Sequence, residues 1–361
     1  LPGGSMKIAI VGASGTLGRV MTRRWAQNGD TLSLLLRRSD PELEVMARCR
    51  TTEDWVFDAE ALREVVSGAE VVVNLAARNP QGQDRDLQET ESFLRVNALG
   101  PALVASACRS AGVPLLHFST VAVYEVGQYR ESALLGEEET LPDQDRETIQ
   151  YFEALSHALR EALATPSGSA EWLALGEALK REVYPQQASV YGLTKLIGER
   201  LVLEVGKPVC AIRLSDVFGP GHESRGVIVD HLRALARANQ TPGASVDVNL
   251  DFRATAHFIY IEDVLRAARG LVGRLVEPAV SLPDVVNLVG HCLDQRGLKA
   301  ALEGLAQRRA STLPTFTEAQ HEDVTYDRRY GSDRISSVLP GFSLSNLDTS
   351  LDETWDALTK S

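Results

Sequence analysis

Short apolar runs alternate with stretches of helical periodicity along the first third of the chain. Continuous apolar runs are typical of parallel strands that are buried on both faces. Apolar residues that recur every three or four positions indicate amphipathic helices between those strands. The alternation predicts an α/β fold with a Rossmann-type, doubly wound parallel sheet. The expected strands are Lys7–Val11, Thr31–Leu36, Val71–Leu75 and Val113–Phe118, and the expected helices are Thr16–Asn28, Asp58–Val66 and Arg85–Ala111, the last with a break near Gly100-Pro101.

An acidic region at about 125–185 interrupts this alternation. We expect it to be a surface insertion with two amphipathic helices, near Thr148–Leu163 and Ala170–Val183. The alternative is a lid over the site or a contact in a dimer. Beyond it the α/β pattern resumes. The expected elements there are helices Val190–Glu204, Val227–Ala238 and Glu262–Leu271, and strands Val209–Leu214, Phe258–Ile261 and Asp284–Leu288.

Charge and composition narrow the class of protein. Hydrophobic residues are 44% of the chain and charged residues 24%, the balance of a soluble globular protein. The net charge of -12 argues against nucleic acid and anionic membrane partners. No segment approaches the ~20 apolar residues that span a membrane. The four cysteines are far apart, which disfavours a metal site and suggests a cytoplasmic protein. Residues 1–5 read as a vector-derived remnant before Met6.

Glycines recur at every third position between the first expected strand and the first helix, at Gly12, Gly15 and Gly18. This spacing permits a sharp turn, close approach of the backbone to a pyrophosphate, and tight packing of helix on strand. The N-terminus of the helix then offers free amides to the anion. The alternative is a plain tight turn. We expect the loop to bind a dinucleotide through Gly12, Ser14, Gly15, Thr16, Leu17 and Gly18.

Two arginines, Arg37 and Arg38, follow the second expected strand, where sites that bind an unmodified ribose carry an acid. A guanidinium suits a 2′-phosphate, because it forms bidentate, charge-assisted hydrogen bonds. The sequence therefore favours NADP, with NAD as the alternative cofactor. The other interpretation is a pair of solvated surface arginines.

Tyr191 and Lys195 lie four residues apart, on one face of an expected helix. A free phenol has a pKa of about 10 and is a poor base at neutral pH. A nearby ammonium stabilises the phenolate and makes the tyrosine a useful acid or base. Ser119 and Thr120 lie at the end of an expected sheet strand. Their hydroxyls are candidates to polarise the carbonyl oxygen of a substrate. The alternatives are a surface Tyr–Lys pair and hydroxyls that cap a turn.

Taken together, these motifs make the sequence resemble the extended short-chain dehydrogenase/reductases, also called the NAD-dependent epimerase/dehydratase family. The resemblance implies a Rossmann domain at 6–213 plus about 255–290, and a substrate domain at about 214–254 plus 291–361. It also implies that Thr120 holds the substrate oxygen, that Tyr191 is the acid/base, and that Lys195 holds the cofactor. The ordered matches are GASGTLG from Gly12, VNLAA from Val73, VNALGPALVASAC from Val96, HFSTVAVY from His117, YGLTK from Tyr191, RLSDVFGPG from Arg213 and FIYIEDV from Phe258.

Further implications of this resemblance concern the cofactor and the assembly. Leu75, Ala76 and Ala77 are expected to lie against the cofactor. A homodimer is expected through the helices Arg85–Ala111 and Val190–Glu204. The family's adenine-contacting aspartate should lie between Asp54 and Asp58, but Asp58 fits equally well as a helix N-cap.

Several positions depart from the family pattern. Val121-Ala122 stands where dehydratases carry an acidic pair, which makes a 4,6-dehydratase unlikely. Asp216 stands in the stretch where nucleotide-sugar epimerases usually carry an asparagine. It would repel a diphosphate, unless it accepts hydrogen bonds from sugar hydroxyls. The arginine expected before Phe258 is absent, with Arg253 displaced upstream, although Arg225 and Arg253 are candidates to bind an anion from new positions.

The favoured function is an NADP-dependent carbonyl reductase or dehydrogenase that acts on a ketone or alcohol through Thr120, Tyr191 and Lys195. The alternative is a nucleotide-sugar epimerase that passes through a transient ketone and retains its cofactor. A third hypothesis, a cofactor-dependent binding protein without activity, is disfavoured by the intact Thr–Tyr–Lys set. The substrate itself is not encoded in any pattern that we recognise.

Overall fold

The computed structural model describes residues 4–55, 58–79, 92–126, 133–137, 190–206, 208–222, 226–241, 243–248, 255–277, 280–309, 313–318 and 328–360. Several predictions fall outside these residues. They are the two helices of the acidic insert, the start of the helix expected at Arg85–Ala111, and the anion-binding candidates Arg225 and Arg253.

A seven-stranded sheet forms the core of the N-terminal part, in the order β11-β7-β5-β4-β1-β2-β3. The pairs β1–β2, β2–β3, β1–β4 and β4–β5 are parallel, and β1, β4 and β5 are buried along nearly all their length. This arrangement confirms the predicted doubly wound α/β fold. The strands are β1 Lys7–Val11, β2 Thr31–Leu36, β3 Arg48–Thr51, β4 Val71–Asn74, β5 Leu115–Thr120, β7 Val209–Leu214 and β11 Val285–Leu288.

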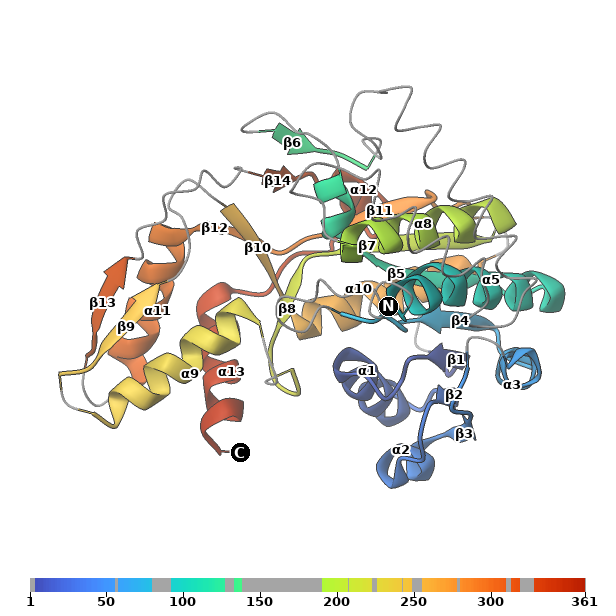
Figure 1. Cartoon of the computed structure of the whole chain (residues 1–361), viewed down its shortest axis with the longest axis horizontal. Helices are drawn as coiled ribbons and strands as arrows, with labels where there is room; N and C mark the ends of the chain where they lie inside the picture. The colour runs from blue at the N-terminus through green and yellow to red at the C-terminus, as the bar shows by residue number, and fades with distance from the viewer. Residues whose placement is uncertain are drawn as a thin grey trace. The chain divides into compact units, whose positions relative to one another are not determined.

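The strand order reverses beside β1. The chain passes from β1 to β2 and β3 on one side, and then to β4 and β5 on the other. Open α/β sheets bind ligands at such a switch point, beyond the carboxyl ends of the strands. Helices α5 and α8 pack side by side near β5 (Figure 1). The helices of this part are α1 Thr16–Gln27, α2 Pro41–Met46, α3 Ala59–Val66, α5 Gly100–Ala111 and α8 Val190–Val205.

Two short elements, α2 and β3, are absent from the sequence-based expectation. Helix α2 begins with Asp40 as its N-cap and Pro41 in its first turn, a recognisable start signal. Strand β3 has the sequence RCRT, which contains no apolar run. Its pairing with β2 stabilises it, and the sequence of a strand does not reveal its partner.

The expected break near Gly100-Pro101 is wrong: the chain stays helical there. A π-helical segment, η1 (Leu94–Leu99), runs directly into α5. Pro101 has no N–H group, so it cannot donate to the Asn97 carbonyl one turn earlier, and a widened turn suits that position. A Cβ on Gly198 of α8 would lie 1.9 Å from the same Asn97 oxygen. The glycine therefore allows α8 to approach η1 closely.

Contacts between Cα atoms divide the chain into two compact units. The first comprises 1–129, 138–213 and 271–286, and the second 130–137, 214–270 and 287–361. The assignment of a cofactor role to one and a substrate role to the other stays a prediction. The elements of the second unit include strands β6 Ala133–Leu135, β8 Asp216–Phe218, β9 Ser245–Val248, β10 Thr255–Tyr260, β12 His291–Asp294, β13 Thr315–Glu318 and β14 Arg328–Tyr330, and helices α9 Val227–Asn239, α11 Gln295–Arg309, α12 Asp333–Val338 and α13 Leu347–Lys360; helix α10, Ile261–Leu275, spans the boundary.

The second unit contains a three-stranded sheet, β12-β10-β8, and the two parallel pairs β13–β9 and β14–β6. Of the free cysteines, Cys108 and Cys210 are buried, as expected from their apolar surroundings. No helix in the described part of the chain is both long enough and apolar enough to cross a bilayer.

Candidate functional site

The glycines after β1 are required by close backbone contacts. Gly12 has a φ of 89°, and a Cβ on it would lie 2.5 Å from the Ala76 nitrogen. A Cβ on Gly18 would lie 2.4 Å from the Gly12 carbonyl oxygen. The Gly15 amide donates to that same oxygen at 3.1 Å, which closes the turn. The spacing read from the sequence therefore corresponds to a tight loop in which backbone packs directly against backbone.

Helix α1 begins at this loop. Its N-cap is Gly15, and no side chain caps it among the described residues. Thr16 and Leu17 form the half-buried first turn, and the Ser14 carbonyl accepts a hydrogen bond from Arg19 Nε at 3.2 Å. Uncapped amides at the switch point of the sheet fit the pyrophosphate of a dinucleotide.

Replacing Gly12 with Ala is expected to lower the free energy of unfolding by about 2 kcal/mol or more, because a Cβ at positive φ is strained and would contact Ala76. Dinucleotide affinity should fall as well. Urea denaturation and cofactor titration measure the two effects. Gly68→Ala is the matched control, since Gly68 also has positive φ but no atom near its missing Cβ. Equal losses of stability in the two variants would contradict the close-contact explanation.

The segment after β4 is held by two asparagine side chains. The Leu75 amide donates to the Val11 carbonyl at 2.8 Å, and Asn74 Oδ1 accepts from the Ala76 amide at 3.1 Å. Asn97 Oδ1 accepts from the Arg78 amide, and its Nδ2 donates to the Arg78 carbonyl. Ala76 is buried and Ala77 is exposed. The segment after β4 therefore exposes the small side chain of Ala77 at the edge of the sheet.

The same Asn97 amide reaches the helix that carries Tyr191. Its Nδ2 lies 3.3 Å from Thr194 Oγ1, which in turn donates to the Tyr191 carbonyl. Neither Asn74 nor Asn97 was singled out from the sequence. The signal that could have found them is a lone amide in an apolar stretch, because a buried amide must be hydrogen-bonded.

Arg37 and Arg38 are exposed just beyond β2. Nearby arginines are engaged: Arg23 pairs with Glu42, and Arg50 with Glu64. Within the described ranges, no carboxylate forms an ion pair with Arg37 or Arg38. The structure thus leaves two guanidinium groups open at the place where the sequence predicts a phosphate contact.

Lys195 is fully buried beneath the end of β5. Its Nζ donates to the Phe118 carbonyl at 2.6 Å. Burial lowers the pKa of Lys195 to about 8, and the charge of Glu199 opposes that fall. Tyr191 is half-buried one turn earlier on α8, with its ring centroid 6.5 Å from that of Phe93 in an edge-to-face contact. The hydrogen bond to Phe118 therefore brings the ammonium to the residue that precedes Ser119 and Thr120.

The two predicted hydroxyls differ in their surroundings. Thr120 is half-buried, and its Oγ1 accepts from the Ala122 amide at 3.2 Å, which is the capping role foreseen as the alternative. Its hydroxyl hydrogen is still able to donate. Ser119 is buried, and its Oγ has no hydrogen-bond partner among the described residues. Both lie at the carboxyl end of β5, the edge where ligands bind in such sheets.

The motifs are matched as a set by one family model, described as the NAD dependent epimerase/dehydratase family, over residues 8–164 and 154–278. The chain belongs to this family. Membership makes the protein an NAD(P)-dependent oxidoreductase or epimerase, as the sequence predicts, and supports a nicotinamide dinucleotide as its cofactor. The choice of NADP over NAD is not decided by membership.

Family relatives include reductases. The chain is 26% identical to a dTDP-4-dehydrorhamnose reductase of Mycolicibacterium smegmatis over 336 residues, which cover 93% of this chain and 76% of the relative. It is 32% identical to a ceramide reductase of Caulobacter vibrioides over 140 residues, which cover 36% of this chain and 40% of the relative. Reductases are thus among the proteins that are similar to this chain.

Solved structures of family members share the fold. A UDP-glucuronic acid 4-epimerase from Bacillus cereus, in complex with NAD, superposes with a TM-score of 0.66 at 17% identity, covering 98% of this chain and 99% of that one. A putative epimerase from Burkholderia cenocepacia gives a TM-score of 0.67 at 18% identity, with 99% of each chain covered. At this identity the likeness establishes the fold alone.

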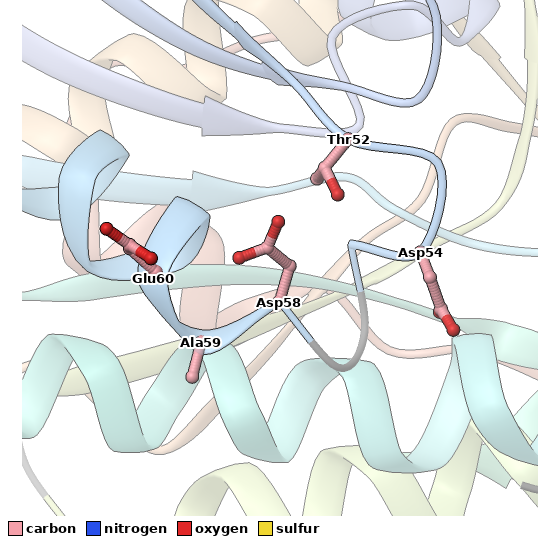
Figure 2. Close-up of a pocket in the computed structure, with 5 residues that line it drawn as sticks. All are labelled: Thr52, Asp54, Asp58, Ala59 and Glu60. Atoms are coloured by element: carbon pink, nitrogen blue, oxygen red, sulfur yellow. The ribbon is translucent and has the colours of Figure 1, made fainter.

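A hollow of about 450 Å³ lies between the end of β3 and the start of α3, and Figure 2 shows the residues that line it. Asp58 and Thr52 point toward one another there, and Asp54 points away. Asp58 Oδ1 accepts from the Ala61 amide at 2.8 Å, and this bond is the first reason why the pKa of Asp58 is lowered. Asp54 forms an ion pair with Arg95. The N-cap interpretation of Asp58 is therefore confirmed.

Proposed function

We propose that this family member is an NADP-dependent carbonyl reductase or dehydrogenase. The observation that carries the proposal is the buried Lys195, whose ammonium is bonded to Phe118 O and lies one helical turn from Tyr191. A cation buried at this cost of desolvation, at a ligand-binding sheet edge, is typical of a functional site.

Each candidate residue has a chemical task in this proposal. The Gly12–Gly18 loop and the amides of α1 bind the pyrophosphate, Arg37 and Arg38 bind the 2′-phosphate, and Leu75 to Ala77 line the cofactor. When bound, NADPH supplies the hydride. Lys195 binds the ribose and stabilises the phenolate of Tyr191, which donates a proton to the substrate oxygen. Thr120, together with Ser119, holds that oxygen by hydrogen bonds.

The double variant Arg37→Ala/Arg38→Ala is expected to weaken NADPH binding about 10- to 100-fold, because two charge-assisted contacts to a phosphate are lost. The affinity for NADH should stay within about twofold, since NADH carries no 2′-phosphate. Fluorescence titration with each nucleotide measures both constants. Arg63→Ala, which removes another exposed arginine from α3, is the control. A wild type that prefers NADH, or a variant that loses affinity for NADPH and NADH by the same factor, would contradict a 2′-phosphate contact by these arginines.

The alternative function is epimerisation of a nucleotide sugar through a transient ketone. It is favoured by the fold shared with the UDP-glucuronic acid 4-epimerase. The dTDP-4-dehydrorhamnose reductase instead suggests a sugar ketone that is reduced, and its alignment covers 93% of this chain. A sugar-like carbonyl compound is therefore the substrate class that we propose to test first.

The deciding experiment follows reduced cofactor by its absorbance while a panel of nucleotide-linked 4-keto sugars and simple ketones is added. A reductase consumes NADPH in step with each molecule of substrate. An epimerase converts substrate while its cofactor stays bound and is not consumed. Purified protein that binds neither pyridine nucleotide would overturn both functions.

A further inference from the structure

A buried ion pair joins α8 to β7. Arg213 donates from Nη2 to Glu199 Oε1 at 2.5 Å and from Nε to Oε2 at 3.1 Å. Its Nη1 donates to the Tyr124 hydroxyl at 2.8 Å, and the guanidinium carbon lies 4.8 Å from the centre of the same ring. The three side chains are at most 1% exposed. None of them was identified from the sequence as part of a site.

The network is placed among the predicted catalytic residues. Glu199 follows Lys195 by one turn of α8. Tyr124 lies in η2 (Val121–Val126), the 3₁₀ segment that begins directly after Thr120. Arg213 therefore links the segment after Thr120 to the helix that carries Tyr191 and Lys195.

Stability alone does not account for such a pair. Replacing a buried ion pair with apolar residues is often neutral or stabilising, because desolvation of two charges offsets their attraction. A charged group that is buried without a counter-charge, by contrast, tends to become neutral. Lys195 is buried and would lose its proton most easily if nothing negative faced it.

Among the described residues, Glu199 on α8 and His117 on β5 interact electrostatically with Lys195. Tyr191 lies one turn earlier on α8, Arg213 on β7 holds Glu199, and Tyr124 on η2 is bonded to Arg213. Burial, and the charge of Lys195 itself, hold the pKa of His117 well below its ordinary value, so this imidazole is neutral. Glu199 is the group whose charge favours the protonated Lys195.

We propose that Glu199 is a positioning residue for the Tyr191–Lys195 pair: held by Arg213, its carboxylate keeps the buried Lys195 in the ammonium form. Arg213 acts through Glu199, and Tyr124 fixes the free edge of the guanidinium. The inference rests on the proposed function, because it assigns Glu199 a task in a reaction that needs the ammonium. Its chemical core, a carboxylate that sets the protonation of a lysine, is measurable without any substrate.

The test observes Lys195 directly by NMR of protein made with lysine labelled with carbon-13 at Cε, titrated from neutral to alkaline pH. Lys195→Met identifies its signal by removing it. The assignment is simple, because the chain has only five other lysines: Lys7, Lys180, Lys207, Lys299 and Lys360.

The main variant is Glu199→Gln/Arg213→Met. Glu199→Gln alone leaves Arg213 buried without a counter-charge and is expected to fold poorly. The double variant removes both charges, and loss of the Arg213 cation by itself raises the titration midpoint of Lys195. The double variant is therefore compared with Arg213→Met, which lacks the same cation and keeps the Glu199 carboxylate. We expect the midpoint of Lys195 to lie about one pH unit lower in the double variant than in Arg213→Met. Turnover at pH 8 should then fall about fivefold, because fewer molecules carry the ammonium. In Glu199→Asp, which keeps the carboxylate on a shorter side chain, the titration midpoint of Lys195 should lie between that of the wild type and that of the double variant.

Tyr124→Phe is the matched control, because it deletes one buried hydrogen bond of Arg213 and keeps the ion pair. It should lower stability and leave the Lys195 midpoint unchanged. A folded double variant with the same Lys195 midpoint as Arg213→Met would overturn the inference. A wild type that consumes no NADPH with any carbonyl compound, combined with a midpoint that is lower in the double variant than in Arg213→Met, would instead count against the proposed function alone.

Discussion

Turnover should fall by about 10²- to 10⁴-fold when Tyr191 is replaced with Phe, the range that is typical for the loss of a general acid or base. The ring contact with Phe93 is retained in this variant, so the helix should keep its place. NADPH affinity should change less than about twofold, since only a hydroxyl is removed. Steady-state kinetics and nucleotide titration measure the two effects.

Phe93→Leu provides the comparison for Tyr191→Phe, because it removes the neighbouring ring and leaves the phenol. That variant should lose stability and keep most of its turnover. Activity of Tyr191→Phe within about tenfold of the wild type would show that another group transfers the proton, and the proposed chemistry would then be wrong.

Lys195→Met should abolish most of the activity and yet stabilise the protein at neutral pH. Burial disfavours the ammonium and lowers the pKa of Lys195 from the ordinary lysine value of 10.5 to about 8 in the folded protein. Holding the charge in the core therefore costs about 3 kcal/mol below pH 8. Loss of the hydrogen bond to Phe118 lowers the free energy of unfolding by about 1 kcal/mol. The variant is therefore expected to be more stable than the wild type by about 2 kcal/mol.

The sign of the pH dependence follows from the same pKa shift. Between pH 8 and 10.5 the unfolded chain binds more protons at this lysine than the folded chain does, so wild-type stability rises with pH in that window. The advantage of Lys195→Met should shrink correspondingly. Urea denaturation at several pH values measures it, with the exposed Lys7→Met as the control. A variant that is less stable than the wild type at pH 7 would show that the buried ammonium does not destabilise this fold.

Local patterns in the sequence determined the main elements and the predicted cofactor loop. Strands β1, β2 and β7 have the bounds expected from their apolar runs, and α3 begins after Asp58 as predicted. Each of these signals acts within one turn or one strand. The steric demand on Gly12 and the pairing of Tyr191 with Lys195 on one helix face are local in the same way.

Only the tertiary structure decided which polar groups meet in the core. Glu199 and Arg213 lie on different elements, and Asn97 bridges Arg78 and Thr194, which are far from it in sequence. Periodicity marks such positions as buried but does not name their partners. The reason is physical: a buried charge or amide is stabilised only by a partner at hydrogen-bonding distance, and packing of whole elements sets that distance. The sequence alone therefore predicted the Tyr–Lys pair, whereas the groups that surround its ammonium became visible only in the folded chain.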